Sequence, residues 1–283
     1  RDQPRSRGLG DVYKRQIITA VNSFHGRTLA TMSASGKERW KGIYNPKVDG
    51  FKWVEYNNIE QIRNAITENT CAIMLELVQG EGGVIVADKE YIQEIRKICD
   101  ENNVLLIFDE VQTGIGRLGY MFGYEYYGVE PDIMTLAKGI GGGVPLAALL
   151  AKDNVCCFEA GDQGGTYSMT PIMTAVGLAV VKEMLESDIC KNVREMGSYL
   201  SSNLMTLMEK YSFITEVRGL GLLIAIGLDG VNANEIQAAS LKKRLLVNAP
   251  NVNTLRFMPA LNINKAEIDE CIAVLDSIFQ KYL

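Results

Sequence analysis

Apolar residues in the first half of the chain follow two spacings, one typical of helices and one typical of buried strands. Isoleucines at positions 59, 62 and 66 predict a short amphipathic helix. The apolar stretch 71–78 (CAIMLELV) predicts a buried strand, and 104–108 (VLLIF) predicts another. Between them, a helix-spaced segment starts after Asp88, a residue type that caps helices. Strand, helix and strand in this order form a βαβ unit, which is typical of a parallel sheet covered by helices. The apolar face of the intervening helix consists of Tyr91, Ile92, Ile95, Ile98 and Cys99.

Two long helices are predicted after this region. Thr170 followed by Pro171 indicates a helix start, because proline at the first helical position loses no intrahelical hydrogen bond. The periodic pattern continues to about Glu186, and a second one runs over 189–208.

The last third of the chain has shorter elements. Strands are predicted near 213–218, 222–228 and 253–258. A final helix is predicted to begin at Asn264, which fits a capping box with Glu267. This part therefore has the pattern of a small α+β domain.

Three segments follow from these patterns. Residues 1–16 carry five basic side chains and almost no apolar periodicity, so we expect a foreign or disordered leader. A basic tail that contacts an anionic partner is the alternative. Residues 17–186 are predicted to form a large α/β domain with a mostly parallel sheet, and residues 187–283 a smaller C-terminal domain.

Composition excludes several classes of function. Of 283 residues 47% are hydrophobic, which is enough for a sizeable core. The 29 Lys and Arg against 34 Asp and Glu give a net charge of -5, so no general field attracts nucleic acid or an anionic membrane. One histidine and no CxxC pair argue against a metal site. No apolar run approaches the roughly 20 residues of a membrane helix.

Two residues with candidate chemistry follow predicted strands. Asp109 comes directly after 104–108, at the strand end where α/β sheets place their ligands. Lys138 follows a short apolar stretch and precedes a run of glycines that lets backbone approach a ligand. Either residue alone could be ordinary, a turn cap or a surface charge. Together they match the needs of a pyridoxal-phosphate site, which takes an amine for a Schiff base and a carboxylate for the ring nitrogen.

A dinucleotide fingerprint is the competing interpretation. Residues 114–119 (GIGRLG) fit GxGxxG and follow a strand. The fingerprint needs a regular helix next, whereas the following segment contains Gly119, Gly123, Gly128 and Pro131, which disfavour one. A nicotinamide-dependent dehydrogenase remains the alternative.

Six strings resemble, in order and spacing, the class III (fold type I) aminotransferases, and among these most of all the acetylornithine aminotransferases. The strings are NSFHGRTLATMSASG, LVQGEGGV, LLIFDEVQTGIGRLG, PDIMTLAKGIGGGVPLAA, GDQGGTY and TLRFMPAL. The resemblance covers 17–283. It implies a fold type I transferase with pyridoxal 5'-phosphate as its cofactor and no metal.

The resemblance also implies roles for residues around the cofactor. Lys138 would bind the cofactor covalently and then carry the proton between substrate and cofactor. Asp109 would pair with the pyridinium nitrogen and Gln112 would reach the ring hydroxyl. Val111 would pack on one ring face and Phe24 on the other.

Further roles concern the substrate and a second subunit. By the same resemblance, Thr166 would contact the cofactor phosphate of the neighbouring subunit, which implies an obligate homodimer with shared sites. Arg27 and Arg256 match substrate-carboxylate arginines, and Glu81 matches a glutamate that can pair with Arg256. His25 is expected to pack beside the site, because the lysine already supplies the base.

The reaction that the resemblance implies is cytoplasmic, in arginine biosynthesis. N-acetylornithine would give its terminal amino group to 2-oxoglutarate, leaving N-acetylglutamate semialdehyde and glutamate. Another ω-aminotransferase, for ornithine, 4-aminobutyrate or putrescine, and a catalytically silent fragment of the fold are the alternatives. The family's phosphate-binding loop is not found upstream of the FHGR string, and Gly165 stands where the family has a hydroxyl.

Overall fold

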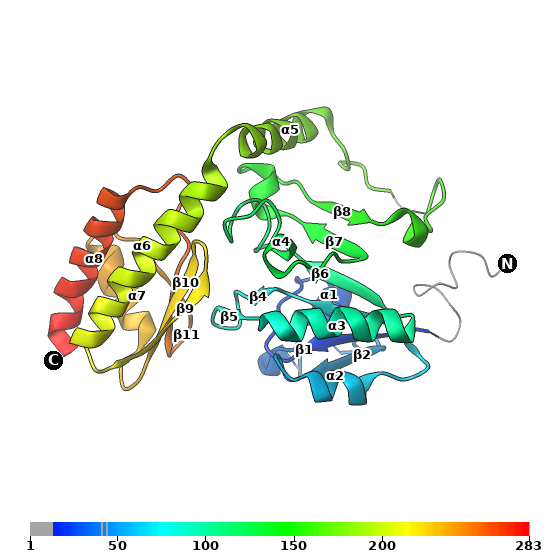
Figure 1. Cartoon of the computed structure of the whole chain (residues 1–283), viewed down its shortest axis with the longest axis horizontal. Coiled ribbons are helices and arrows are strands. Elements are labelled where there is room, and N and C mark those ends of the chain that lie inside the picture. Colours follow the sequence, from blue (N-terminus) through cyan, green and yellow to red (C-terminus); the bar gives the residue numbers. More distant parts are fainter. Residues whose placement is uncertain (1–13, 41, 44, 163, 283) are drawn as a thin grey trace. The chain divides into compact units, whose positions relative to one another are not determined.

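The computed structural model describes residues 14–40, 42–43, 45–162 and 164–282, which form two compact units (Figure 1). The first unit contains the described residues up to 77 together with 87–115 and 124–185, and the second contains 78–86, 116–123 and 186 onward. Residues 1–13 of the predicted leader lie outside the described residues, and Gln16 begins the first strand.

The first unit is built on a six-stranded sheet in the order β2-β1-β3-β6-β7-β8. All neighbouring strands are parallel except β7 and β8, which are antiparallel. The predicted α/β class with a mostly parallel sheet is thus confirmed. The strands are β1 (Gln16–Ala20), β2 (Phe51–Val54), β3 (Thr70–Leu75), β6 (Leu105–Asp109), β7 (Ile133–Leu136) and β8 (Ala148–Ala151).

Helices α2, α3 and α4 contribute apolar side chains to the core of this unit. In α3 the five predicted apolar residues are all buried, and they pack in one core with side chains of β3 and β6. Asp88 occupies the N-cap position, but its side chain makes none of the expected capping hydrogen bonds. The helices are α1 (Leu29–Ala34), α2 (Ile59–Ala65), α3 (Lys89–Asn102), α4 (Tyr124–Tyr127) and α5 (Pro171–Glu186), with short 3₁₀ turns at Glu38–Trp40, Lys138–Gly141 and Asp153–Val155.

The second unit has a four-stranded antiparallel sheet in the order β11-β12-β10-β9. The predicted capping box is present at the start of α8, where Asn264 and Glu267 bond each other's backbone. The β11 sequence, NAPN, has no apolar pattern and was not predicted. The elements are α6 (Ile189–Lys210), β9 (Ile214–Leu220), β10 (Leu223–Leu228), α7 (Ala233–Lys242), β11 (Asn248–Asn251), β12 (Thr254–Phe257), α8 (Lys265–Phe279) and a 3₁₀ turn at Gln280–Tyr282.

Two short segments from the first half of the sequence belong to this second unit. Residues 78–86 form the hairpin of β4 (Val78–Gln79) and β5 (Ile85–Val86), and 116–123 form a series of turns. Their apolar side chains join one cluster with two residues of β10, which explains the grouping. That cluster consists of Val78, Val84, Leu118, Leu223 and Ala225.

In the described part of the chain, no helix combines the length and the apolar character that crossing a membrane requires.

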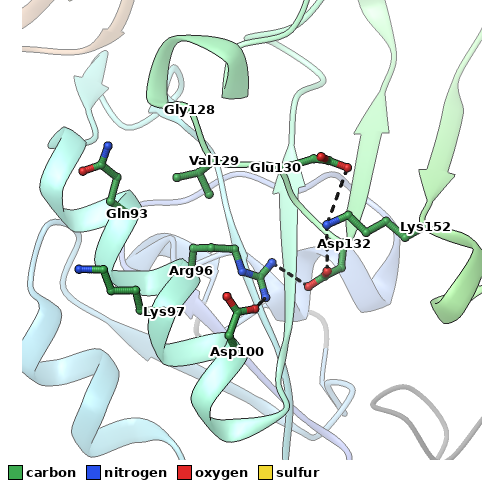
Figure 2. A pocket seen from close by; sticks show the side chains of 9 residues that line it. All are labelled: Gln93, Arg96, Lys97, Asp100, Gly128, Val129, Glu130, Asp132 and Lys152. Atoms are coloured by element: carbon green, nitrogen blue, oxygen red, sulfur yellow. Dashed lines mark hydrogen bonds and ion pairs between the residues drawn. The ribbon is translucent and has the colours of Figure 1, made fainter.

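A pocket of about 490 Å³ is lined by side chains of α3, by residues 128–130 and 132 just before β7, and by Lys152 (Figure 2). Asp132 is central to it: its carboxylate accepts hydrogen bonds from Arg96 at 2.9 Å and from the Leu106 amide at 2.8 Å. Lys152 lies 3.5 Å from the same carboxylate, and Arg96 also pairs with Asp100. Opposite charges neutralise one another in this pocket. The ion pair of Arg96 with Asp132 links α3 to the segment just before β7.

Replacing Asp132 with alanine is expected to lower the free energy of unfolding by about 2–4 kcal/mol, because it leaves the Arg96 guanidinium and a strand amide without their acceptor. Urea unfolding followed by circular dichroism measures the change. Lys97→Ala, in the same pocket, is the control: its exposed pair with Glu94 should contribute far less to the free energy of unfolding. Equal losses in the two variants would contradict this role for Asp132.

Candidate active site

Three charged side chains come from neighbouring strand ends of the first unit. Asp109 is the last residue of β6, and Glu76 directly follows β3. The pairing of Leu75 with Phe108 sets these two carboxyls next to each other across the sheet. Lys138 follows β7, the strand on the other side of β6. Since the three strands are parallel, all three side chains belong to the edge at which strands end, which we call the carboxyl edge.

Asp109 is buried and held from several sides. One carboxylate oxygen, Oδ2, lies 2.8 Å from His25 Nδ1. The other, Oδ1, accepts hydrogen bonds from the Val111 amide at 3.1 Å and the Thr135 hydroxyl at 3.4 Å. A carboxylate fixed in this way cannot turn freely, which suits pairing with a cation at a defined position.

His25 is the one histidine of the chain, and its side chain is only 2% exposed. Burial lowers its pKa, but the hydrogen bond to Asp109 and the charges of Glu76 and Asp109 outweigh burial, so its pKa is raised above the usual value. His25 therefore supports the Asp109 carboxylate from within the protein. Its amide also donates to the Ser35 hydroxyl at 2.8 Å, which fixes the loop after β1.

Glu76 was not predicted as a site residue. It is 6% exposed, and its Oε2 accepts a hydrogen bond from the Phe24 amide at 2.9 Å. Burial raises its pKa to about 7, the Asp109 charge adds to this, and the charges of His25 and Lys138 oppose it. The signal in the sequence was a lone charge inside the apolar run 71–78.

Lys138 has an unusual backbone conformation. Its φ is +47°, in the left-handed region that residues other than glycine seldom adopt. The residue opens a 3₁₀ turn, Lys138–Gly141, and its side chain is exposed. Such strain concentrates at functional sites, because the surrounding structure must hold the residue in place. Lys138 thus stands at the carboxyl edge with its side chain exposed.

The residues expected to contact the cofactor ring also belong to the first unit. Phe24 is half-buried, with the Arg27 guanidinium 5.7 Å from its ring centroid. Val111 and Gln112, both half-buried, follow Asp109 directly. Thr166 is different: it lies in an exposed stretch without regular secondary structure. The roles that the resemblance implies for these residues stay predictions.

Arg256 and Glu81 lie in the second unit. Arg256, on β12, is 5% exposed, and its NH1 donates to Glu81 Oε1 at 2.9 Å and to the Gly80 carbonyl at 2.6 Å. Its NH2 donates to Asn248 Oδ1 at 2.7 Å. The ion pair implied for these two residues is therefore present, and it occupies one edge of the guanidinium.

The donor set at the carboxyl edge fits pyridoxal 5'-phosphate. An exposed amine, Lys138, suits the aldehyde, and a fixed carboxylate, Asp109, suits the protonated ring nitrogen. The Phe24 ring and the Val111 side chain offer apolar faces for a flat ring. The residues that would hold the ring are therefore consistent with this cofactor.

The dinucleotide alternative is not supported by the local backbone. Described residues 114–123 form turns, with positive φ at Ile115, Gly116 and Gly119. The next helix, α4, begins only at Tyr124 and is four residues long. The regular helix that a dinucleotide fingerprint must open is missing from this segment.

Comparison with known proteins gives one consistent family. The family description "Aminotransferase class-III" matches residues 4–279. The match begins inside the predicted leader, 1–16, whose origin stays a prediction. An acetylornithine aminotransferase of Caldanaerobacter subterraneus subsp. tengcongensis is 46% identical over 272 residues, which cover 96% of this chain and 69% of that protein. One from Ralstonia nicotianae is 48% identical over 270 residues, 94% of this chain and 67% of that protein.

Solved structures agree with this. The ornithine aminotransferase of Toxoplasma gondii ME49 superposes with a TM-score of 0.91 at 27% identity, covering 96% of this chain and 66% of that one. The N-acetylornithine aminotransferase of Stenotrophomonas maltophilia K279a gives a TM-score of 0.80 at 31% identity, covering 96% and 67%. The chain spans about two thirds of the length of these relatives.

Proposed function

The chain belongs to the class-III aminotransferase family, and from this premise we propose that it transfers the terminal amino group of N-acetylornithine to 2-oxoglutarate with pyridoxal 5'-phosphate as cofactor. Members of this family depend on that cofactor. The observation that carries the proposal is that Lys138, whose backbone φ is in the left-handed region, and the fixed carboxylate of Asp109 stand at the same edge of the sheet. The names of the related acetylornithine aminotransferases support the choice of substrate. A biosynthetic role in the cytoplasm belongs to the same proposal.

Each residue has a defined task in this proposal. When bound, the cofactor supplies a ring that takes up electrons released at the substrate carbon bearing the amino group. The Lys138 amine would hold the cofactor and move a proton at that carbon. Asp109 would keep the ring nitrogen protonated, and Phe24 and Val111 would enclose the ring. Gln112 would bond the ring hydroxyl.

Two arginines would select the substrates. A guanidinium donates two parallel hydrogen bonds to a carboxylate, so Arg27 and Arg256 suit substrates that carry carboxylates. Glu81 competes for Arg256 through the 2.9 Å ion pair. A substrate with a second carboxylate, such as 2-oxoglutarate, would have to displace Glu81, whereas a donor without one would leave the pair in place.

Arg256→Ala is expected to raise the KM for 2-oxoglutarate by about 30-fold or more, because a buried partner for the carboxylate is removed. The KM for N-acetylornithine should change much less. Glu81→Gln should act in the opposite direction and lower the KM for 2-oxoglutarate, since the competitor for Arg256 loses its charge. Steady-state kinetics with each substrate varied measures both. Parallel changes for the two substrates would count against this assignment.

A homodimer completes the proposal. Several large apolar side chains within residues 149–185 of the first unit are exposed, which suits a surface that a second subunit would cover. Thr166 lies in the same region, which supports a contact with a second subunit's cofactor. Sedimentation at several protein concentrations distinguishes a dimer from a monomer. The exposed side chains are Leu149, Leu150, Phe158, Tyr167, Met169, Ile172, Leu178 and Leu185.

A trapping experiment tests the cofactor assignment directly. The chain is incubated with pyridoxal 5'-phosphate, reduced with borohydride and digested, and the labelled lysine is found by mass spectrometry. Label on Lys138 alone supports the proposal. Label scattered over surface lysines identifies a catalytically silent fragment instead. Comparing kcat/KM for N-acetylornithine, ornithine, 4-aminobutyrate and putrescine then decides among amino donors.

A further inference from the structure

Two carboxyls stand next to each other at the carboxyl edge, and the proposed function uses only one of them. Leu75 and Phe108 are paired on adjacent parallel strands, and Glu76 and Asp109 are the next residue on each side. Neighbouring strands lie about 4.8 Å apart, and the charge of Asp109 acts on the Glu76 carboxyl and disfavours its ionised form. Glu76 is 6% exposed and Asp109 8%, so water does little to screen them. Such an arrangement needs a proton or a cation between the two groups.

The loop after β1 supplies the link. Its Phe24 amide donates to Glu76 Oε2 at 2.9 Å, and the next residue, His25, places its Nδ1 2.8 Å from Asp109 Oδ2. The Ser35 hydroxyl accepts a hydrogen bond from the His25 amide and so fixes this loop. One short segment therefore contacts both carboxyls, one through its backbone and the other through the imidazole.

Several groups act on the linked side chains of Glu76, His25 and Asp109. His25, Asp109 and Lys138 act on Glu76 through their charges. The Tyr56 hydroxyl donates to the Glu76 backbone carbonyl at 2.6 Å. Glu76 and Asp109 both act on His25 and favour its cationic form. The imidazole thus lies in the field of two carboxyls rather than one.

We propose that Glu76 is a positioning residue for the cofactor ring: its carboxyl acts on the His25 imidazole, which lies 2.8 Å from Asp109 and holds that carboxylate in place for the ring nitrogen. The inference rests on the proposed function, because the ring nitrogen is the group that Asp109 would face. Glu76 itself touches neither substrate nor cofactor in this role. Its carboxylate accepts from the Phe24 amide, next to His25, and the His25 imidazole contacts Asp109, so its effect reaches the ring through these neighbours.

The single histidine makes the test direct. The sequence contains one histidine, His25, so long-range ¹H–¹⁵N spectra of the chain show the signals of one imidazole. A pH titration of these signals gives the His25 pKa without cofactor or substrate. In the unmodified chain we expect this pKa above 6.5. Glu76→Gln keeps an oxygen that can accept from the Phe24 amide but removes the charge, and should lower the His25 pKa by about one unit or more.

Two further variants separate charge from packing. Glu60→Gln makes the same chemical change at an exposed position of α2 and should leave the His25 titration unchanged. Glu76→Asp keeps a carboxylate, though shortened, and should retain most of the raised His25 pKa. If Glu76→Gln does not fold, Glu76→Asp decides: it draws the carboxylate back by one methylene, so a His25 pKa somewhat below that of the unmodified chain supports the inference and an unchanged one overturns it.

The cofactor-loaded protein provides a second readout. The absorbance of bound pyridoxal 5'-phosphate is titrated in the unmodified and Glu76→Gln chains, and the variant should lose the protonated-ring signal at a lower pH. An unchanged His25 pKa in Glu76→Gln, or an unchanged absorbance titration, would refute the role of Glu76. Failure of the proposed function is distinct from this, because it appears as missing label on Lys138 while the His25 titration of the cofactor-free chain still stands.

Discussion

Lys138→Ala is expected to abolish the borohydride-fixed cofactor and to reduce transamination by at least about 1,000-fold, because both the covalent attachment and the proton transfer depend on its amine. A φ of +47° is as unfavourable for alanine as for lysine, so the substitution adds no backbone strain and the fold should tolerate it. Peptide mass spectrometry and single-turnover absorbance with N-acetylornithine measure the two losses.

Two controls accompany this prediction. Lys138→Arg keeps a positive charge at the site but cannot supply a neutral amine, so it should be as inactive as the alanine variant. Lys97→Ala removes an exposed lysine of α3 and should retain full label and activity. Activity or label that persists in Lys138→Ala would mean that another lysine holds the cofactor.

Asp109→Asn is expected to lower the rate of transamination by about 100- to 1,000-fold. The amide keeps the shape of the side chain and can still accept from the Val111 amide, but it brings no negative charge to the ring nitrogen. The His25 pKa should fall as well, because the hydrogen bond and the charge that raise it are both weakened. Half-reaction kinetics and the imidazole titration measure the two effects on one sample.

The matched control for this variant is Asp49→Asn, the same chemical change at an exposed position of the first unit. It should alter neither the rate nor the titration. A slow Asp109→Asn chain with an unchanged His25 pKa would show that the carboxylate acts without the imidazole, and an active one would remove Asp109 from the site.

The sequence identified the parts of the site that depend on strand ends. Asp109 and Lys138 stand out because each follows an apolar strand, and this local signal survives in the structure. Glu76 was overlooked because the run 71–78 reads as one strand, whereas β3 ends at Leu75. Periodicity alone cannot show where an apolar run stops being a strand.

Contacts between distant residues were the part that periodicity could not predict. His25 meets Asp109 across 84 positions of sequence, and Arg256 meets Glu81 across 175. The pairing of Arg256 with Glu81 came from family resemblance, while that of His25 with Asp109 came only from the structure. The grouping of 78–86 and 116–123 with the second unit likewise depends on apolar packing against β10.

That grouping bears on how such a protein can evolve. The backbone passes between the two units at 77/78, 86/87, 115/116, 123/124 and 185/186. A single genetic crossover near codon 186 would transplant the C-terminal third without Val78, Val84 and Leu118, and so remove from β10 the side chains that pack with Leu223 and Ala225. Recombination at one junction would yield a poorly packed hybrid, and the two units are therefore expected to descend together as one inherited block.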